Sequence, residues 1–334
     1  MRQWIVVVLS CMIVLMSFGR TAEAATATSS YAVIDADTGR LLIGMNEHER
    51  LPIASLTKMW TAFVAIEESS LKTKTTISKK ATLSEGSSIY LVEGETTTLK
   101  TLLNGLLLRS GNDAATAIAE EVGGSVGGFV KLMNDYAVLY GLSDTQFENP
   151  SGLHNDKHLS SAYDTAQMLR IAMQDKDFRK IATTKYYKND LKNPTVWKNK
   201  HKLLHYNKYA IAGKTGYTKV AGRTLATYFE KDGKRVIVVT LNESNDWQVH
   251  AGFAEAVFEK YDKRLLAKKG LYQARDDLQV ELKHPVYALI SKEERNKVKS
   301  ILRMPRIEKG NTGIWTFYLD GQPLIEEPVQ MVWK

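Results

Sequence analysis

The stretch Ser55-Leu-Thr-Lys-Met-Trp-Thr-Ala-Phe-Val64 organises the N-terminal half of this chain. Its apolar residues recur every three or four positions, which is typical of a helix that buries one face. This stripe consists of Leu56, Met59, Trp60, Phe63 and Val64. Ser55 directly precedes this stripe. Lys58 follows Ser55 by three residues, about one helical turn, so both side chains would lie on the same helix face. We therefore predict a buried helix that presents a serine and a lysine at its start.

A second polar motif, Ser110-Gly-Asn112, follows another leucine-rich helical pattern over residues 98–108. Asp113 has the chemistry of an N-cap for the next helix, and Gly123-Gly124 would end that helix. We predict that the motif forms a tight connection between two buried helices.

A third motif, Lys214-Thr-Gly216, lies just before two β-prone runs. These runs, residues 223–229 and 235–241, are separated by Asp232-Gly233, a strong signal for a hairpin turn. We predict that the motif lies on a neighbouring strand of the same sheet.

The remaining patterns place strands at both ends and helices in the middle. Residues 31–35 and 40–43 predict a hairpin around Asp37-Thr-Gly39; this is also the aspartic protease triplet, but no second copy supplies the partner carboxylate. A helical pattern covers residues 129–140 and is followed by a turn-rich loop over residues 142–162. A further helical pattern covers residues 250–266. We expect an α+β fold, an antiparallel sheet covered by helices, over residues 25–271, and a small all-β C-terminal domain over residues 272–334.

The N-terminal residues predict export. Arg2, an apolar run of about 15 residues and Ala22-Glu-Ala24 match a secretory signal peptide over residues 1–24, and the run is short for a membrane span. Cys11, the single cysteine, lies in this run, so the mature chain would contain no thiol. We expect an extracytoplasmic protein. The formal charge is +8, but the basic runs, such as Lys79-Lys80 and Lys268-Lys269, are short and have no aromatic residues between them. A nucleic-acid platform would need such aromatic residues, so we expect no nucleic-acid partner.

Together the three motifs carry the residue types that acyl transfer through a serine ester requires. Ser55 needs a base, and a buried Lys58 could act as one because desolvation and Lys214 would lower the pKa of its amine. Ser110 could relay a proton, and Asn112 could hold the substrate backbone. The remaining motif residues are Lys214 and Thr215, which suit a terminal carboxylate, and Gly216, which lets the strand backbone come close.

One motif is ambiguous on its own, because Ser69-Ser-Leu-Lys72 is a second Ser-x-x-Lys. That copy lies at the expected end of the first helix without catalytic surroundings. Order and spacing relative to the other two motifs therefore favour Ser55 as the nucleophile.

The three motifs resemble those of the penicillin-binding protein and serine β-lactamase superfamily. The likeness is greatest to the low-molecular-mass D-alanyl-D-alanine carboxypeptidases. It covers about residues 29–267 and includes the flanking segments Pro52–Met59, Leu108–Ala115, Phe147–Leu153, Ser161–Asp164 and Gly213–Thr218.

The resemblance implies a β-lactamase/transpeptidase-like fold and specific roles. Ser55 would be acylated with Lys58 as its base, Ser110 would relay protons, and the backbone N–H groups of Ser55 and Tyr217 would form the oxyanion hole. It implies a peptidoglycan stem peptide ending in D-Ala-D-Ala as substrate, β-lactams as covalent inhibitors, and no cofactor or metal. Relatives often end in an amphipathic membrane helix, whereas residues 330–334 show no such pattern, so we expect no C-terminal membrane anchor.

Three alternatives remain open. Transpeptidase or endopeptidase action would use the same acyl-enzyme. A class A β-lactamase would need a Glu-x-x-Leu-Asn segment, but the corresponding loop reads Gln146-Phe-Glu-Asn-Pro150. A metal hydrolase could use the histidine pairs His154/His158 and His201/His205, although neither has the glutamate of zinc proteases, and we favour surface or hydrogen-bonded histidines.

Overall fold

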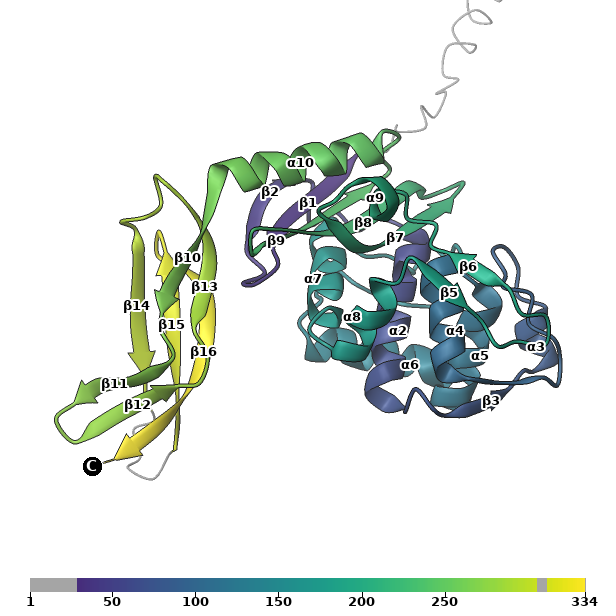
Figure 1. Ribbon diagram of the computed structural model, residues 1–334, viewed down its shortest axis with the longest axis horizontal. Coiled ribbons are helices and arrows are strands. Elements are labelled where there is room, and N and C mark those ends of the chain that lie inside the picture. The colour runs from purple at the N-terminus through teal and green to yellow at the C-terminus, as the bar shows by residue number, and fades with distance from the viewer. Residues whose placement is uncertain (1–28, 305–310, 334) are drawn as a thin grey trace, which may run out of the picture.

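A five-stranded antiparallel sheet forms the centre of the molecule, in the strand order β2-β1-β9-β8-β7 (Figure 1). The computed structural model describes residues 29–304 and 311–333, so the predicted signal peptide and Cys11 lie outside the described residues. The sheet consists of β1 (Ser30–Asp35), β2 (Leu41–Met45), β7 (Ala210–Thr218), β8 (Gly222–Lys231) and β9 (Lys234–Leu241).

The predicted hairpins are confirmed. β1 pairs with β2 around the predicted turn. β8 pairs with β9, and the turn residues Asp232 and Gly233 both have positive φ, at 52° and 76°, as the favoured two-residue hairpin turn requires. β7 pairs with β8 with Gly216 opposite Thr224, so the third motif lies on a neighbouring strand as predicted.

Helices cover both faces of this sheet because alternate strand residues point to opposite sides. On β9, Ile237 and Val239 belong to the core beneath the large helical layer. Val236 and Val238 belong to a smaller core beneath α10. The large layer contains α2 (Thr57–Glu68), α4 (Leu99–Asn104), α5 (Asn112–Gly123), α6 (Val126–Leu139), α7 (Ala162–Ala172) and α8 (Lys176–Ala182). The opposite face carries α10 (Asp246–Lys260), next to which lies α9 (Leu203–Tyr206) (Figure 1).

Short elements connect the helices. They are the 3-10 helix η2 (Ala54–Leu56), the π-helical turn η3 (Gly105–Arg109), α3 (Lys79–Thr82), and the paired strands β3 (Lys74–Thr76) with β4 (Thr96–Thr98) and β5 (Tyr186–Lys188) with β6 (Val196–Lys198). The expected α+β fold with a helix-covered antiparallel sheet is confirmed.

Two local predictions were wrong. Gly111, rather than Asp113, is the N-cap residue of α5. The Asp113 carboxylate instead accepts hydrogen bonds from the backbone of Ile89 and Leu91, so it holds the loop before α4. The predicted helix over residues 250–266 ends at Lys260, because Tyr261 begins a strand that pairs with β13 (Val286–Ser291).

The C-terminal part is made of strands and turns in the residues that the structure describes. β10 (Tyr261–Ala267) pairs with β13 (Val286–Ser291). A second sheet has the order β11-β12-β16-β15-β14, formed by β11 (Gly270–Arg275), β12 (Leu278–Leu282), β14 (Val298–Arg303), β15 (Thr312–Leu319) and β16 (Gln322–Trp333). The predicted boundary at residue 272 falls inside β11, and we propose that this β-rich unit begins where α10 ends.

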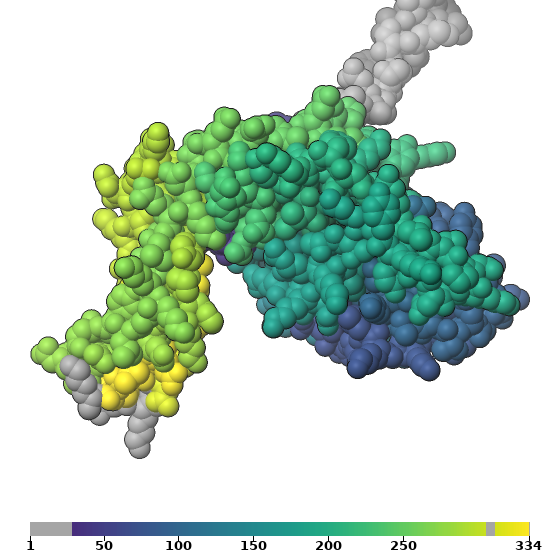
Figure 2. Space-filling view, viewed as in Figure 1, coloured from purple at the N-terminus to yellow at the C-terminus, as the bar shows by residue number. Residues whose placement is uncertain are grey.

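Figure 2 shows this unit as a separate lobe beside the helical part. Polar contacts join the two: the buried Asp35 at the end of β1 accepts the Leu289 N–H at 3.0 Å, and Arg40 forms an ion pair with Glu294. Over residues 29–304 and 311–333, no helix has the length and apolar character needed to cross a membrane.

Candidate active site

Ser55 lies in η2, immediately before α2, where the chain makes a tight turn. Ala54 has φ of +48°, an unusual conformation for a residue with a Cβ. The Lys58 Nζ lies 3.0 Å from Ser55 Oγ, 2.7 Å from Asn112 Oδ1, and within hydrogen-bond distance of the Ser151 carbonyl. The structure thus brings together Ser55, Lys58 and Asn112 from two of the three motifs.

The environment of Lys58 favours its neutral amine. The side chain is fully buried, and burial, followed by Lys214 and Lys200, lowers its pKa well below 10.5. A neutral amine has two N–H groups and one lone pair. Because Asn112 Oδ1 and the Ser151 carbonyl can accept both N–H groups, the lone pair is left for the hydroxyl proton of Ser55.

Ser110 and Asn112 occupy the connection between η3 and α5. Ser110 has φ of +65° and lines the same pocket as Ser55. Both polar atoms of the Asn112 amide bond to protein groups: Oδ1 accepts from Lys58 Nζ, and Nδ2 donates to the Glu85 carbonyl. In this structure Asn112 therefore positions Lys58, whereas its predicted contact with a substrate backbone stays a prediction.

The third motif supplies a second buried cation. Lys214 is 2% exposed, and burial, followed by Lys200, lowers its pKa to about 7. Its Nζ donates to the Thr215 carbonyl at 2.7 Å. Thr215, Gly216 and Tyr217 line the pocket that also contains Ser55.

Gly216 sets how closely β7 approaches Ser55. A Cβ at this position would lie 2.9 Å from the Ser55 backbone nitrogen and 2.3 Å from Thr224 Oγ1. The Thr224 hydroxyl in turn donates to the Ile53 carbonyl at 3.1 Å, which ties the strand to the turn before Ser55. Only glycine permits this approach, so the backbone N–H groups of Ser55 and Tyr217 belong to adjoining segments of chain.

Ser55, Ser110 and residues 215–217 line an open pocket of about 450 Å³, whereas the buried Lys58, Asn112 and Lys214 are not part of its lining. The lining also contains Ser87, Lys200, Arg223, Thr224, Asp246 and Trp247. The pocket combines a serine beside a buried amine, close backbone N–H groups and several cations, an arrangement suited to acyl transfer from a carboxylate-bearing substrate.

A family model described as D-alanyl-D-alanine carboxypeptidase matches residues 18–245. The chain belongs to the D-alanyl-D-alanine carboxypeptidase family. It is accordingly a serine-type D-Ala-D-Ala carboxypeptidase, a hydrolase related to the low-molecular-mass penicillin-binding proteins.

Similar proteins support this assignment along most of the chain. The D-alanyl-D-alanine carboxypeptidase DacF of Bacillus subtilis is 34% identical over 93% of this chain and 86% of its own length. The structure of penicillin binding protein 5 from Haemophilus influenzae covers 91% of this chain and 96% of its own, with a TM-score of 0.75 and 23% identity, which shows the shared fold. A structure of a Streptomyces K15 DD-transpeptidase variant is 30% identical, with a TM-score of 0.64 over 67% of this chain and 97% of its own.

The carboxypeptidase contains one supporting residue whose place the sequence did not reveal. His158 is buried, and its Nε2 lies 2.8 Å from Thr57 Oγ1, while its Nδ1 accepts the Glu148 N–H at 3.0 Å. Thr57 also donates to the Ala54 carbonyl at 2.8 Å. His158 therefore supports the strained turn before Ser55. In the sequence, the spacing of four residues from His154 marked His158 only as a possible metal ligand.

A second unpredicted residue of the carboxypeptidase is Arg223. Its guanidinium donates to both carboxylate oxygens of the buried Asp246, at 2.7 and 3.2 Å, and lies over the Trp247 ring at 5.9 Å. Arg223 lines the pocket together with Asp246 and remains 43% exposed. Its position at the start of a strand pattern gave no signal of this.

The other histidines of the pairs are also engaged with protein groups. His201 Nε2 lies 3.1 Å from the Ala226 carbonyl, and His205 Nε2 lies 2.9 Å from the Asn199 carbonyl. His154 pairs with Asp156 at 3.4 Å. The interpretation of these histidines as surface or hydrogen-bonded residues is confirmed, with His154 43% exposed.

Proposed function

We propose that this carboxypeptidase removes the terminal D-alanine from peptidoglycan stem peptides through an acyl-enzyme on Ser55. The observation that carries the proposal is the Lys58 amine, which lies 3.0 Å from the Ser55 hydroxyl and has two other hydrogen-bond acceptors. A neutral amine held in this way can take the hydroxyl proton as the bond to substrate forms.

The reaction would begin when Ser55 Oγ attacks the carbonyl carbon of the penultimate D-alanine and Lys58 takes the hydroxyl proton. The carbonyl oxygen would become an oxyanion that accepts hydrogen bonds from the backbone N–H groups of Ser55 and Tyr217. Breakage of the peptide bond would release D-alanine after a proton passes from Lys58, by way of Ser110, to the leaving nitrogen. Water would then hydrolyse the ester, with Lys58 taking a proton from it, and restore Ser55.

The carboxylate of the terminal D-alanine would bind near Lys214 and Thr215. Protonated Lys214 supplies charge, and the Thr215 hydroxyl supplies a hydrogen bond. Arg223 lines the same pocket and is 43% exposed, so its guanidinium could donate a further hydrogen bond to this carboxylate. Asn112 and Gly216 complete the site by positioning Lys58 and by admitting the β7 backbone.

The same nucleophile would open β-lactam rings and stay acylated, which makes these compounds covalent inhibitors. Cleavage of stem peptides would place the enzyme outside the cytoplasm, in agreement with the predicted signal peptide over residues 1–24. By trimming wall precursors the enzyme would contribute to cell-wall biogenesis and cell shape.

The test uses the chain from residue 25 onward and a peptide that ends in D-alanyl-D-alanine. We expect release of free D-alanine and, with penicillin, a covalent adduct that mass spectrometry locates on Ser55. Ser55→Ala should abolish both signals, whereas Ser69→Ala in the second Ser-x-x-Lys should keep both. An adduct that persists in Ser55→Ala would overturn the assignment.

Transpeptidation is a second candidate, because it differs only in the acceptor of the acyl group. A similar protein carries the name DD-transpeptidase, which supports transpeptidation as a candidate activity. Adding a free amine acceptor and measuring the ratio of transferred to hydrolysed product distinguishes the two. β-Lactamase action is disfavoured because the loop lacks the required segment and Glu148 accepts a hydrogen bond from the neighbouring Gln146 at 2.8 Å.

A further inference from the structure

A row of lysines follows the edge of the active site in the segment Trp197-Lys-Asn-Lys-His-Lys202. Burial alternates strictly along it: Trp197, Asn199 and His201 are buried, whereas the lysine that follows each of them is exposed. In extended chain, alternate residues point to the same side. Lys198, Lys200 and Lys202 therefore form one face, which we call the basic strip together with Arg109 beside it.

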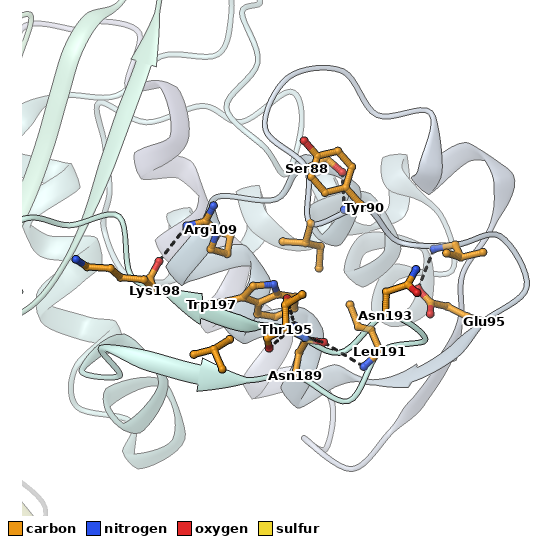
Figure 3. Close-up of a pocket in the computed structure, with 13 residues that line it drawn as sticks. Ser88, Tyr90, Glu95, Arg109, Asn189, Leu191, Asn193, Thr195, Trp197 and Lys198 are labelled. Atoms are coloured by element: carbon orange, nitrogen blue, oxygen red, sulfur yellow. Dashed lines mark hydrogen bonds between the residues drawn. The ribbon is translucent and has the colours of Figure 1, made fainter.

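Two hydrogen bonds hold this segment against the end of η3. The Lys200 N–H donates to the Leu108 carbonyl at 3.0 Å, and Arg109 Nη1 donates to the Lys198 carbonyl at 3.1 Å. Figure 3 shows this second contact, with the Lys198 side chain extending away from Trp197 and Asn189. Since Arg109 directly precedes Ser110, the basic strip is fixed next to the second catalytic motif.

The charges of the basic strip are not neutralised by protein carboxylates. Within residues 29–304 and 311–333, none of the ion pairs involves its four members. The strip lines an open hollow of about 340 Å³ whose other walls are Asn199, His205 and Tyr206, so no acidic side chain faces it. Partial burial and the nearby Arg109 also lower the pKa of Lys200, which reflects this crowding of positive charge.

The hollow adjoins the active site at Lys200, which lines both. Lys200 Nζ also donates to Ser87 Oγ at 3.4 Å, and Ser87 lines the catalytic pocket as well. A group attached to a substrate in that pocket can thus reach the basic strip along one surface.

We propose that the basic strip binds a second carboxylate of the substrate, carried by the peptide outside its terminal D-alanyl-D-alanine. The proposal rests on the proposed function and adds a preference to it: acidic peptides should be better substrates than peptides in which that carboxylate is an amide. A side-chain carboxylate suits the hollow because three exposed amines and one guanidinium can each donate to it. Attachment to the bound peptide also favours this ligand over a separate phosphate-bearing polymer, because the effective concentration of a tethered group is high.

The test compares two N-acetylated tripeptides, glutamyl-D-alanyl-D-alanine and glutaminyl-D-alanyl-D-alanine. We expect the unaltered enzyme to prefer the acidic peptide, with a lower KM and a similar kcat. The double variant Lys198→Gln/Lys202→Gln should raise the KM for the acidic peptide about three- to tenfold and leave the amide peptide unchanged, as two exposed charge pairs would give. The preference should fall as salt is raised.

Lys268→Gln/Lys269→Gln is the matched control. Both lysines are exposed, and the charge change is the same, but they lie in the β-rich C-terminal part. This variant should keep the preference for the acidic peptide. Lys200 is left intact throughout because it lines the catalytic pocket.

Other outcomes overturn the proposal. Equal losses for both peptides would mean that the strip only attracts the terminal carboxylate, and no loss for either would mean that it does not act on substrate. Inhibition by polyphosphate that depends on Lys198 and Lys202, without an acid preference, would assign the strip to a wall polymer. Calorimetry on the Ser55→Ala protein measures the affinity of both peptides and so tests the preference even if neither peptide is hydrolysed. This measurement distinguishes a failure of the proposed function from a failure of the proposed acid preference.

Discussion

His158 is joined by a hydrogen bond of 2.8 Å to Thr57, which is close to Ser55 in the chain. The direction of this bond follows from its neighbours. The Glu148 N–H donates to His158 Nδ1, so Nε2 carries the ring proton and donates to the Thr57 hydroxyl, which donates to the Ala54 carbonyl. Burial and Lys58 lower the pKa of His158 to about 4, which keeps this neutral tautomer at physiological pH. The series of bonds holds Ala54 in its left-handed conformation.

Replacement of His158 should therefore impair catalysis through the turn before Ser55. We expect His158→Leu to lower kcat about ten- to hundredfold, because the backbone N–H of Ser55 would lose its fixed direction. His158→Gln should retain most activity, since its amide can accept from Glu148 and donate to Thr57. Steady-state kinetics and the rate of penicillin acylation measure the effect. A Leu variant with normal kcat but a lower melting temperature would show a purely structural role.

Gly216→Ala should disrupt the contact between β7 and the nucleophile. The added Cβ would meet the Ser55 nitrogen at 2.9 Å and Thr224 Oγ1 at 2.3 Å, so the strand must move away from the oxyanion site. We expect kcat/KM to fall about a hundredfold or more, as for loss of one oxyanion donor. Gly252→Ala is the matched control, because a Cβ there meets nothing within 4 Å, and it should leave kcat/KM unaltered. Equal behaviour of the two variants would contradict the close-approach argument.

The pH dependence of kcat/KM should show two limbs with different origins. Activity should fall at low pH as Lys58 becomes protonated and can no longer accept the Ser55 proton. Activity should also fall as pH rises above about 7, because Lys214 loses the charge that binds the carboxylate. Lys214→Arg should move the alkaline limb upward, since a guanidinium stays charged. An alkaline limb unchanged in this variant would assign it to another group.

Lys214 should also lower stability in a pH-dependent manner. Its pKa is lowered from 10.5 to about 7, so between these values the unfolded chain binds more protons than the folded chain, and stability rises with pH. Lys214→Met removes this cost, and the variant should gain most stability below pH 7. The gain should shrink by about 1.4 kcal/mol for each pH unit between 7 and 10. Urea unfolding at pH 6 and pH 9 measures it; a gain independent of pH would contradict the assignment.

Local patterns in the sequence were sufficient for the main sheet and for the elements that carry the three motifs. The hairpins around Gly39 and Gly233, the helix after Ser55 and the strand of Lys214 follow from residue periodicity and turn chemistry, which act over a few residues. Element ends were less predictable. The helix pattern beyond residue 260 gave way to β10 because Tyr261 pairs with Ser291, a partner 30 residues away.

The partners of the candidate catalytic residues could not be predicted from local patterns. Ser151 accepts a hydrogen bond from Lys58 across 93 residues of sequence, and His158 contacts Thr57 across 101. Arg223 and Asp246 form their ion pair because β8 and the start of α10 meet at one edge of the pocket. Nothing in the local sequence specifies such contacts.

The sequence by itself determined the fold class, the family and the order of the three motifs, because periodicity, turn residues and reactive side chains are local properties of the chain. Only the tertiary structure decided how these residues work together. Burial sets the pKa of Lys58 and Lys214, and packing of β7 against η2 places Gly216 beside Ser55. Both effects depend on which distant segments exclude water from the site, and that is a property of the folded chain alone.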